Sequence, residues 1–239
     1  MRTGRPREFD IDQSLDRAVQ VFWRQGYEGT AISDLTDALG INRPSLYAAF
    51  GNKESLFRRA LERYTGRTAG YGPESLAQPT ARAVVEHLLR GAVETTTGRG
   101  TPRGCLGVQG ALVSSPDNDP VRRKLASWRR AGEAALRARL VRAREHGDLP
   151  AGADPADLAR WVTTVIQGIA VQAAGGASRR QLHRVVELTL RGWDAVLADA
   201  TTATDTGPDP AAAATDTQPK AAEEAAGADT ADAQPHPAT

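Results

Sequence analysis

Residues 31–50, AISDLTDALGINRPSLYAAF, carry the side chains whose types and spacing point most directly to a chemistry, the recognition of a polyanion. Gly40 and Asn42 lie in a tight turn between two short amphipathic stretches, which predicts two helices joined as a helix-turn-helix. The apolar positions that are expected to hold these helices in place are Ile32, Leu35, Ala38, Leu39, Ile41, Leu46 and Phe50. In such a motif the second helix enters the major groove of DNA. The positions left to face outward on it are Arg43, Pro44, Ser45, Tyr47 and Ala49.

The distribution of charge around the second helix agrees with a polyanionic partner. Residues 38–53 contain no carboxylate but include Arg43 and Lys53, as expected of a surface that approaches phosphates. Arg43 is suited to donate to guanine or to phosphate, and the hydroxyls of Ser45 and Tyr47 are suited to phosphates or base edges. Lys53 begins the next helix, so its ammonium and the free N–H groups of that helix are expected to hold one phosphate together. Double-stranded DNA is therefore the predicted partner.

Three arginines, Arg2, Arg5 and Arg7, precede the first acidic residue of the chain. Gly4 and Pro6 favour an extended backbone between them. Arms of this kind lie in a minor groove or along the phosphate backbone. The alternative is an ordinary chain terminus whose charge is incidental.

The elements that must position these side chains are helices, because the first 200 residues show no alternating strand pattern of useful length. Asp10, Ser33 and Asn42 are placed to cap helix starts, and Gly26 and Gly40 to end helices. Helices are expected between residues 10 and 26 and over 33–39, 43–50, 53–67, 80–97, 104–114, 120–145, 155–174 and 179–200. The predicted fold class is all-α, with about nine helices. The predicted regions are 1–67 with the helix-turn-helix, a helical effector-binding and dimerisation domain at 75–200, and a tail at 201–239.

Composition excludes several classes of protein. The chain has 239 residues and a net charge of +1, but residues 201–239 hold seven acids and one base, which leaves a charge of +7 on residues 1–200. The tail contains no large apolar side chain, so disorder is expected there. A single cysteine excludes an intrachain disulfide and a Cys-rich zinc site. The absence of a long apolar stretch or signal peptide predicts a cytoplasmic protein that neither crosses nor binds a membrane.

The expected helix at 155–174 carries a wide apolar stripe, and the one at 179–200 is apolar over most of its circumference. Helices of this kind need partners on more than one side. Core burial accounts for one side, and a subunit interface is the natural account of the second. The residues expected at a homodimer interface are Trp161, Val165, Ile169, Val186, Leu190 and Trp193.

In the C-terminal half, the residues that could react or bind a ligand are a cysteine and a few polar and aromatic side chains. Cys105 lies next to Arg103 in RGCLGVQG, at the expected start of a helix, and both neighbours would favour its thiolate. One interpretation is a cysteine that senses oxidants or electrophiles, and the other is a small buried hydrophobic residue. The candidate residues for lining an effector pocket are His87, Cys105, Gln109, Trp128 and Gln167. The histidines show no paired ligand spacing, so neither a metal nor a cofactor is expected.

Residues 1–67 resemble the DNA-binding domain of TetR-family transcriptional regulators. The matching segments are FWRQGYEGT at the end of the first helix, the turn LGINRPSLYAAF, and GNKESLF at the start of the fourth. The resemblance implies an all-α homodimer that binds a palindromic operator, with a small-molecule pocket and a dimer interface in the C-terminal domain. It also implies DNA contacts from Thr30, Ser33, Arg43, Pro44, Ser45, Tyr47 and Lys53. Ala49 departs from the family, in which many members have a phosphate-contacting histidine at this position.

The resemblance and the residues together favour a dimeric, ligand-responsive transcriptional regulator, most often a repressor in such families. Its two N-terminal domains would read half-sites about one helical turn apart. A sensor acting through Cys105 is a variant of this interpretation. An enzyme is not expected, because the sequence shows no nucleophile–base–acid set. A helical protein that binds other proteins rather than DNA is the remaining alternative.

Overall fold

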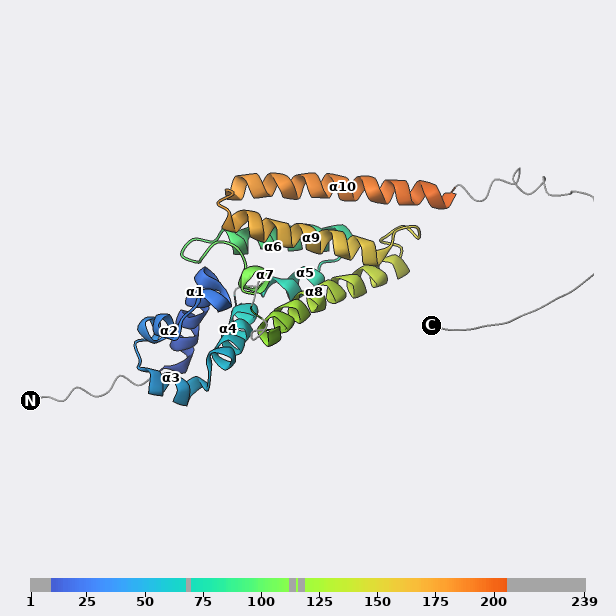
Figure 1. The fold of residues 1–239 in the computed structure, drawn as a ribbon. Helices are drawn as coiled ribbons and strands as arrows, with labels where there is room; N and C mark the ends of the chain where they lie inside the picture. Colours follow the sequence, from blue (N-terminus) through green and yellow to red (C-terminus); the bar gives the residue numbers. More distant parts are fainter. Residues whose placement is uncertain (1–9, 68–69, 112–114, 116–118, 206–239) are drawn as a thin grey trace, which may run out of the picture. The chain divides into compact units, whose positions relative to one another are not determined.

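The computed structural model describes residues 10–67, 70–111, 115 and 119–205, and this part of the chain contains helices and no strand. The all-α class that the sequence predicts is therefore confirmed. The helices are α1 (Ile11–Gly29), α2 (Ile32–Leu39), α3 (Arg43–Phe50), α4 (Lys53–Arg67), α5 (Tyr71–Leu76), α6 (Ala81–Thr96), α7 (Leu106–Gln109), α8 (Asp119–Glu145), α9 (Pro155–Ala174) and α10 (Arg179–Asp205) (Figure 1).

Helix α1 begins and bends where its sequence predicts. The Asp10 carboxylate accepts hydrogen bonds from the backbone N–H groups of Asp12 and Gln13 at 2.9 and 3.1 Å, which caps the helix start. Gly26 adopts φ 70° and ends the regular part of the helix, although a further turn continues to Gly29. A left-handed conformation costs little at glycine, which has no Cβ to clash.

Helices α2 and α3 form the expected pair with one difference at the start of α2. Ser33 does not cap α2; the helix begins at Ile32, and the Asp34 carboxylate accepts from the Ala31 N–H at 2.9 Å. Gly40 ends α2 with φ 70°. Asn42 caps α3 by accepting from the Ser45 N–H at 2.9 Å. The predicted roles of Gly40 and Asn42 in the turn are therefore confirmed. Only the predicted cap of α2 at Ser33 is wrong.

Two short helices differ from the sequence prediction. Helix α5 occupies the expected break between residues 67 and 80, where the Ser75 hydroxyl donates to the Tyr71 carbonyl and contacts the His87 ring. Helix α7 is a single turn rather than the expected 104–114 helix. Gly104 has φ 91° and therefore cannot belong to a right-handed helix. Residues 112–114 lie outside the described part.

The helices enclose two apolar cores. One core joins α1–α4 with α7 and the first turns of α8, and the other lies among α6, α8, α9 and α10. Helix α10 runs alongside α9 and also packs on α6 (Figure 1). It extends to Asp205, five residues beyond its expected end. None of the helices in the described residues is long and apolar enough to span a bilayer.

Candidate nucleic-acid interface

Helix α3 is held by two buried side chains and leaves its other faces to solvent. Leu46 and Phe50 are buried in the N-terminal core. Arg43, Pro44 and Ser45 are exposed, and Tyr47 is 45% exposed although it is a large aromatic residue. An exposed tyrosine next to an arginine offers a ring and two kinds of hydrogen-bonding group to a groove. The structure therefore brings these four predicted residues together on one open surface.

Lys53 lies beside this surface at the first turn of α4. Asn52 caps the helix by accepting from the Ser55 N–H at 2.8 Å. The Lys53 ammonium lies over the Tyr27 ring, 4.5 Å from its centroid. Partial burial lowers the pKa of Lys53, and the carboxylates of Glu28 and Asp34 act in the opposite direction. The lysine is thus held in place by an aromatic ring, which does not neutralise its charge.

The two residues expected at the start of α2 differ in their surroundings. Ser33 is exposed in the first turn of the helix. Thr30 is 1% exposed, and its hydroxyl donates to the Gly26 carbonyl at 2.6 Å. Because this hydroxyl is buried and hydrogen-bonded inside the fold, the structure does not place Thr30 on the exposed surface with the α3 residues. Ala49 is half-buried against the core.

Two residues that sequence reasoning missed support this surface from behind. Tyr27 provides the ring under Lys53. Arg59 donates to the Ala49 carbonyl at 3.2 Å, and its guanidinium lies 5.0 Å from the centre of the Phe50 ring. Both contacts join residues far apart in the sequence, so no local spacing could have revealed them. The segment FWRQGYEGT contains the tyrosine but gives no sign of its partner.

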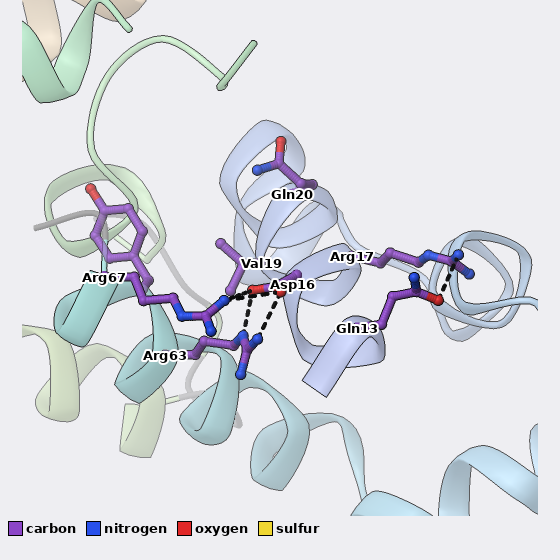
Figure 2. A pocket seen from close by; sticks show the side chains of 8 residues that line it. Gln13, Asp16, Arg17, Val19, Gln20, Arg63 and Arg67 are labelled. Atoms are coloured by element: carbon purple, nitrogen blue, oxygen red, sulfur yellow. Dashed lines mark hydrogen bonds and ion pairs between the residues drawn. The ribbon is translucent and has the colours of Figure 1, made fainter. Parts of the chain in front are cut away.

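A charged contact fixes α4 against α1. Figure 2 shows Arg63 and Arg67 of α4 meeting Asp16 of α1, while Arg17 and Gln13 pair with each other. Arg63 binds both carboxylate oxygens of Asp16, and it reaches Asp12 at 2.8 Å. The hydrogen bond from Arg63 lowers the pKa of Asp16, and the charges of Arg63 and Arg67 add to this effect. These arginines bind carboxylates of α1 and so hold α4 against α1.

The predicted arm residues Arg2, Arg5 and Arg7 lie outside the described residues. Their expected contact with the minor groove therefore stays a prediction.

The surroundings of Cys105 differ from those that the sequence predicts. Arg103 turns away, and its guanidinium donates to the carbonyls of Ala173 and Ala177. The Cys105 side chain is buried, and its sulfur accepts a hydrogen bond from the Tyr64 hydroxyl at 3.2 Å. Burial, followed by the proximity of Cys105, raises the pKa of Tyr64. Burial raises the pKa of Tyr71, and the nearby Cys105 adds to this effect.

The five effector-pocket candidates do not form one group. Gln109 accepts from the Cys105 N–H at 3.0 Å, and the Trp128 ring packs against Gly107, so that three candidates lie in or beside α7. His87 contacts Ser75 of α5 at 2.8 Å. Gln167 lies half-buried on α9.

The apolar residues of α9 and α10 divide between the core and the surface in a way the sequence did not predict. Ile169, Val186, Leu190 and Trp193 are buried within the chain's own core, so these side chains are not available to a partner subunit. Trp161 and Val165 are half-buried. The large apolar side chains that remain exposed on these two helices are Val171, Val185, Leu188 and Val196.

Comparison with known proteins places this geometry in a family. Residues 15–60 match the bacterial regulatory proteins of the tetR family, and residues 81–189 match the tetracyclin repressor-like C-terminal domain. The chain is 34% identical over 192 residues to the HTH-type transcriptional repressor ComR of Escherichia coli K12, covering 80% of this chain and 91% of ComR. The chain belongs to the TetR family of transcriptional regulators. The class that the sequence predicted, a regulator rather than an enzyme, is confirmed.

Two further TetR-family relatives are similar over most of their length. The repressor BdcR of Escherichia coli K12 is 33% identical over 182 residues, covering 75% of this chain and 86% of BdcR. A cysteine mutant of the TetR-family regulator CifR has been solved in complex with 26-bp double-strand operator DNA. That structure superposes with a TM-score of 0.76 at 45% identity and covers 79% of this chain and all of the CifR chain.

Proposed function

We propose that this TetR-family protein is a dimeric repressor that binds a palindromic operator with α3 in the major groove and is released by a small-molecule effector. One observation carries the DNA-binding part of this proposal: α3 presents Arg43, Ser45 and Tyr47 to solvent beside the Lys53 ammonium, on a segment without carboxylates. The operator complex of CifR and the repressor names of ComR and BdcR support the same function.

The roles of the side chains follow from their positions. Arg43 lies in the first turn of α3 and is suited to a guanine edge or a phosphate. Ser45, Tyr47 and the exposed Ser33 of α2 offer hydroxyls to phosphates or bases. Pro44 offers apolar contact next to Arg43. Lys53 and the free N–H groups at the start of α4 can hold one phosphate from two sides.

A second copy of the chain is needed to bind the second half-site. The exposed side chains Val171, Val185, Leu188 and Val196 continue the apolar faces of α9 and α10 beyond the core. We place the subunit interface on these residues, with Trp161 and Val165 at its edge. The interface would bring two α3 helices to half-sites about one helical turn apart.

Release by an effector requires a second conformer that binds the effector better than the DNA-binding conformer does. Cys105, Gln109 and Trp128 lie in or beside α7, which contacts α1, α4, α8 and α9. A ligand bound beside α7 is therefore well placed to act on α1 and α4. It can shift the equilibrium only by its difference in affinity between the two conformers.

The first experiment is selection of genomic fragments by the full chain, followed by titration of the selected operator. Arg43→Ala and Tyr47→Ala are expected to weaken operator binding about 10-fold or more each. Arg137→Ala is the matched control, because Arg137 is exposed on α8, in the C-terminal bundle. Undiminished affinity in both α3 variants, or equal loss in the control, would contradict the proposed interface.

A second candidate for the effector step is an electrophile or oxidant that reacts with Cys105. The observation that favours it is the hydrogen bond that the Tyr64 hydroxyl donates to the Cys105 sulfur at 3.2 Å. The alternative is that Cys105 only packs in the core that joins α7 to α1 and α4.

Cys105→Ser tests the second candidate, because it removes the only thiol in the chain. The wild-type complex with operator is expected to dissociate on titration with peroxide or a quinone, and the serine variant is expected to stay bound. Release of both proteins at the same concentration would show that the cysteine is a packing residue. Thermal unfolding of the variant, measured alongside, reports any loss of packing.

A further inference from the structure

Tyr27 lies at the junction between the N-terminal helices and α7. The bend at Gly26 turns the chain so that the Tyr27 side chain enters the core, where it is 5% exposed. Its ring stacks near Phe22 at 6.3 Å and meets the edge of Phe57 at 5.2 Å, centroid to centroid. Aromatic contacts of this kind fix the plane of a ring. The ring is therefore rigidly placed by one residue of α1 and one of α4.

One face of this ring carries the Lys53 ammonium. The Nζ atom lies 4.5 Å from the ring centroid, within the range of a cation–π contact. Within the described part of the chain, no carboxylate forms an ion pair with Lys53. The ring thus determines where the ammonium lies and leaves its positive charge available to a phosphate.

The backbone of the same residue is tied to α7. The bend at Gly26 takes Tyr27 out of the regular helix, and its N–H donates to the carbonyl of Gly110 at 2.8 Å. Gly110 caps the C-terminal end of α7. The neighbouring Glu28 carboxylate accepts from the N–H and the hydroxyl of Ser115 at 2.6 and 2.9 Å. The end of α1 is therefore attached by three hydrogen bonds to the segment that follows α7.

Helix α7 is in turn held by α8. Arg129 donates to the Gly107 carbonyl at 2.8 Å. The Trp128 ring packs so closely on Gly107 that a Cβ there would come within 2.2 Å of it. A displacement of α8 is therefore transmitted to α7 and from there to the Tyr27 backbone.

We propose that Tyr27 is a positioning residue for operator binding: its ring sets the place of the Lys53 ammonium, and its backbone makes that place depend on α7. The inference rests on the proposed contact between Lys53 and a DNA phosphate. It differs from a change in the separation of the two subunits, because it acts within one N-terminal domain. A shift of α7 moves the platform under the lysine even when α3 keeps its fold.

The geometry can be tested without DNA, because the chain has only three lysines, Lys53, Lys124 and Lys220. In the full-length protein with ¹³C-labelled lysine, the Cε protons of Lys53 are expected to resonate upfield of the other two, because they lie over an aromatic ring. Tyr27→Leu should remove this shift, and Tyr27→Phe should keep it. A Lys53 resonance that is not shifted upfield in the wild type, or one unaffected by Tyr27→Leu, would overturn the inference.

Operator titrations at several salt concentrations test the consequence for binding. Lys53→Gln is expected to lower the slope of log affinity against log salt by about two, because the proposed dimer then loses one phosphate contact at each half-site. Tyr27→Leu should lower the affinity about 3- to 10-fold and reduce the slope, whereas Tyr27→Phe should bind as the wild type. In the Lys53→Gln background, Tyr27→Leu should have no further effect on affinity.

The outcomes separate the two claims. An unchanged salt slope in Lys53→Gln would overturn the phosphate contact and the inference with it. A lowered slope in Lys53→Gln together with an unchanged slope in Tyr27→Leu would overturn the inference alone. An equal loss of affinity from Tyr27→Leu in both backgrounds would mean that the tyrosine acts through packing, which also overturns it.

The dependence on α7 is tested with two adjacent arginines of α8. Arg129→Met removes the hydrogen bond to Gly107, and Arg130→Met makes the same change of charge at an exposed position. The first is expected to move the Lys53 resonance toward those of the other lysines, and the second to leave it in place. Equal spectra from the two variants would refute the link to α7. If Arg129→Met does not fold, Gly107→Ala, which forces α7 or Trp128 to move, is compared with Gly132→Ala, where nothing lies within 4 Å.

Discussion

The guanidinium of Arg63 binds two carboxylates of α1, and the role of this arginine is therefore structural. It binds Asp16 through two nitrogens and Asp12 through the third. A bidentate pair of this kind has a defined geometry, which a single lysine ammonium could not reproduce. Arg67 adds a longer contact to Asp16 at 3.3 Å. At the scale of single residues, the basic side chains of this domain therefore fall into two groups. Some are exposed on α3, and others pair with carboxylates between α1 and α4.

The Asp16–Arg63 pair predicts a specific pH dependence of stability. The hydrogen bond from Arg63 lowers the pKa of Asp16 in the folded state below its usual value of 3.8. The pair therefore stabilises the fold fully above about pH 4, and its contribution is lost as the pH falls through the lowered pKa. In urea unfolding at pH 7, 5, 4 and 3, Asp16→Asn should be less stable than the wild type at pH 7, and this difference should shrink toward pH 3.

The control for this prediction is Asp37→Asn, which changes an exposed aspartate of α2. Its difference from the wild type should be small at every pH. A difference for Asp16→Asn that stays constant from pH 7 to pH 3 would mean that the carboxylate contributes nothing through its charge.

At the scale of elements, helix boundaries set by local chemistry were predictable, and those set by tertiary contacts were not. Asp10, Gly40 and Asn42 cap or end their helices as the sequence indicates, because each acts on backbone groups within three or four residues. Helix α5 and the short α7 depend instead on distant partners, such as His87 for Ser75 and Tyr64 for Cys105. Nothing in their local sequence encodes these partners.

The same limit applies to the proposed DNA-facing surface. The open positions of α3 follow from helical periodicity, because Leu46 and Phe50 define the buried side. The burial of Thr30 does not follow from it, since that burial depends on how the chain bends at Gly26. The support that Tyr27 gives to Lys53 also requires the folded chain, because 26 positions separate the two residues.

Gly40 offers a test of the turn between α2 and α3. It adopts φ 70°, and a Cβ added there would meet nothing within 4 Å, so the cost of a substitution comes from the backbone alone. Gly40→Ala is expected to destabilise the protein by about 1 kcal/mol or more, and Gly40→Asn by less, because asparagine tolerates the left-handed region. Urea unfolding measures both.

Gly66 of the same domain has open space around it as Gly40 does, but it adopts an ordinary helical backbone conformation. It lies in α4, also with nothing within 4 Å, and has no left-handed φ. Gly66→Ala should therefore stabilise the protein by about 0.5–1 kcal/mol. If Gly40→Ala and Gly66→Ala change the stability in the same direction, backbone conformation is not the cause of either effect.

At the scale of the whole molecule, the sequence predicted an excess of apolar surface on α9 and α10 but not which side chains form it. Both helices carry apolar residues around most of their circumference, so periodicity cannot separate the face toward the core from the face toward solvent. Trp193 is fully buried and stacks near Trp161 at 6.3 Å. Leu188, which precedes Trp193 on α10, is 60% exposed.

The proposed dimer interface is formed by the exposed apolar side chains, and a substitution at Leu188 tests it. Leu188→Glu puts a charge on the exposed apolar face of α10 without touching the core, so the monomer should keep its fold and its thermal unfolding. Analytical ultracentrifugation is expected to show half the mass of the wild type. Operator affinity should fall about 100-fold or more, because the two half-sites are then bound independently.

Ala134→Glu is the control, since it introduces the same charge at an exposed position of α8. It should leave both mass and affinity unchanged. A Leu188→Glu protein that remains a dimer would place the subunit contact on another surface. A monomeric variant with full operator affinity would separate DNA binding from dimerisation, and the palindromic operator would then have no basis in the structure of the protein.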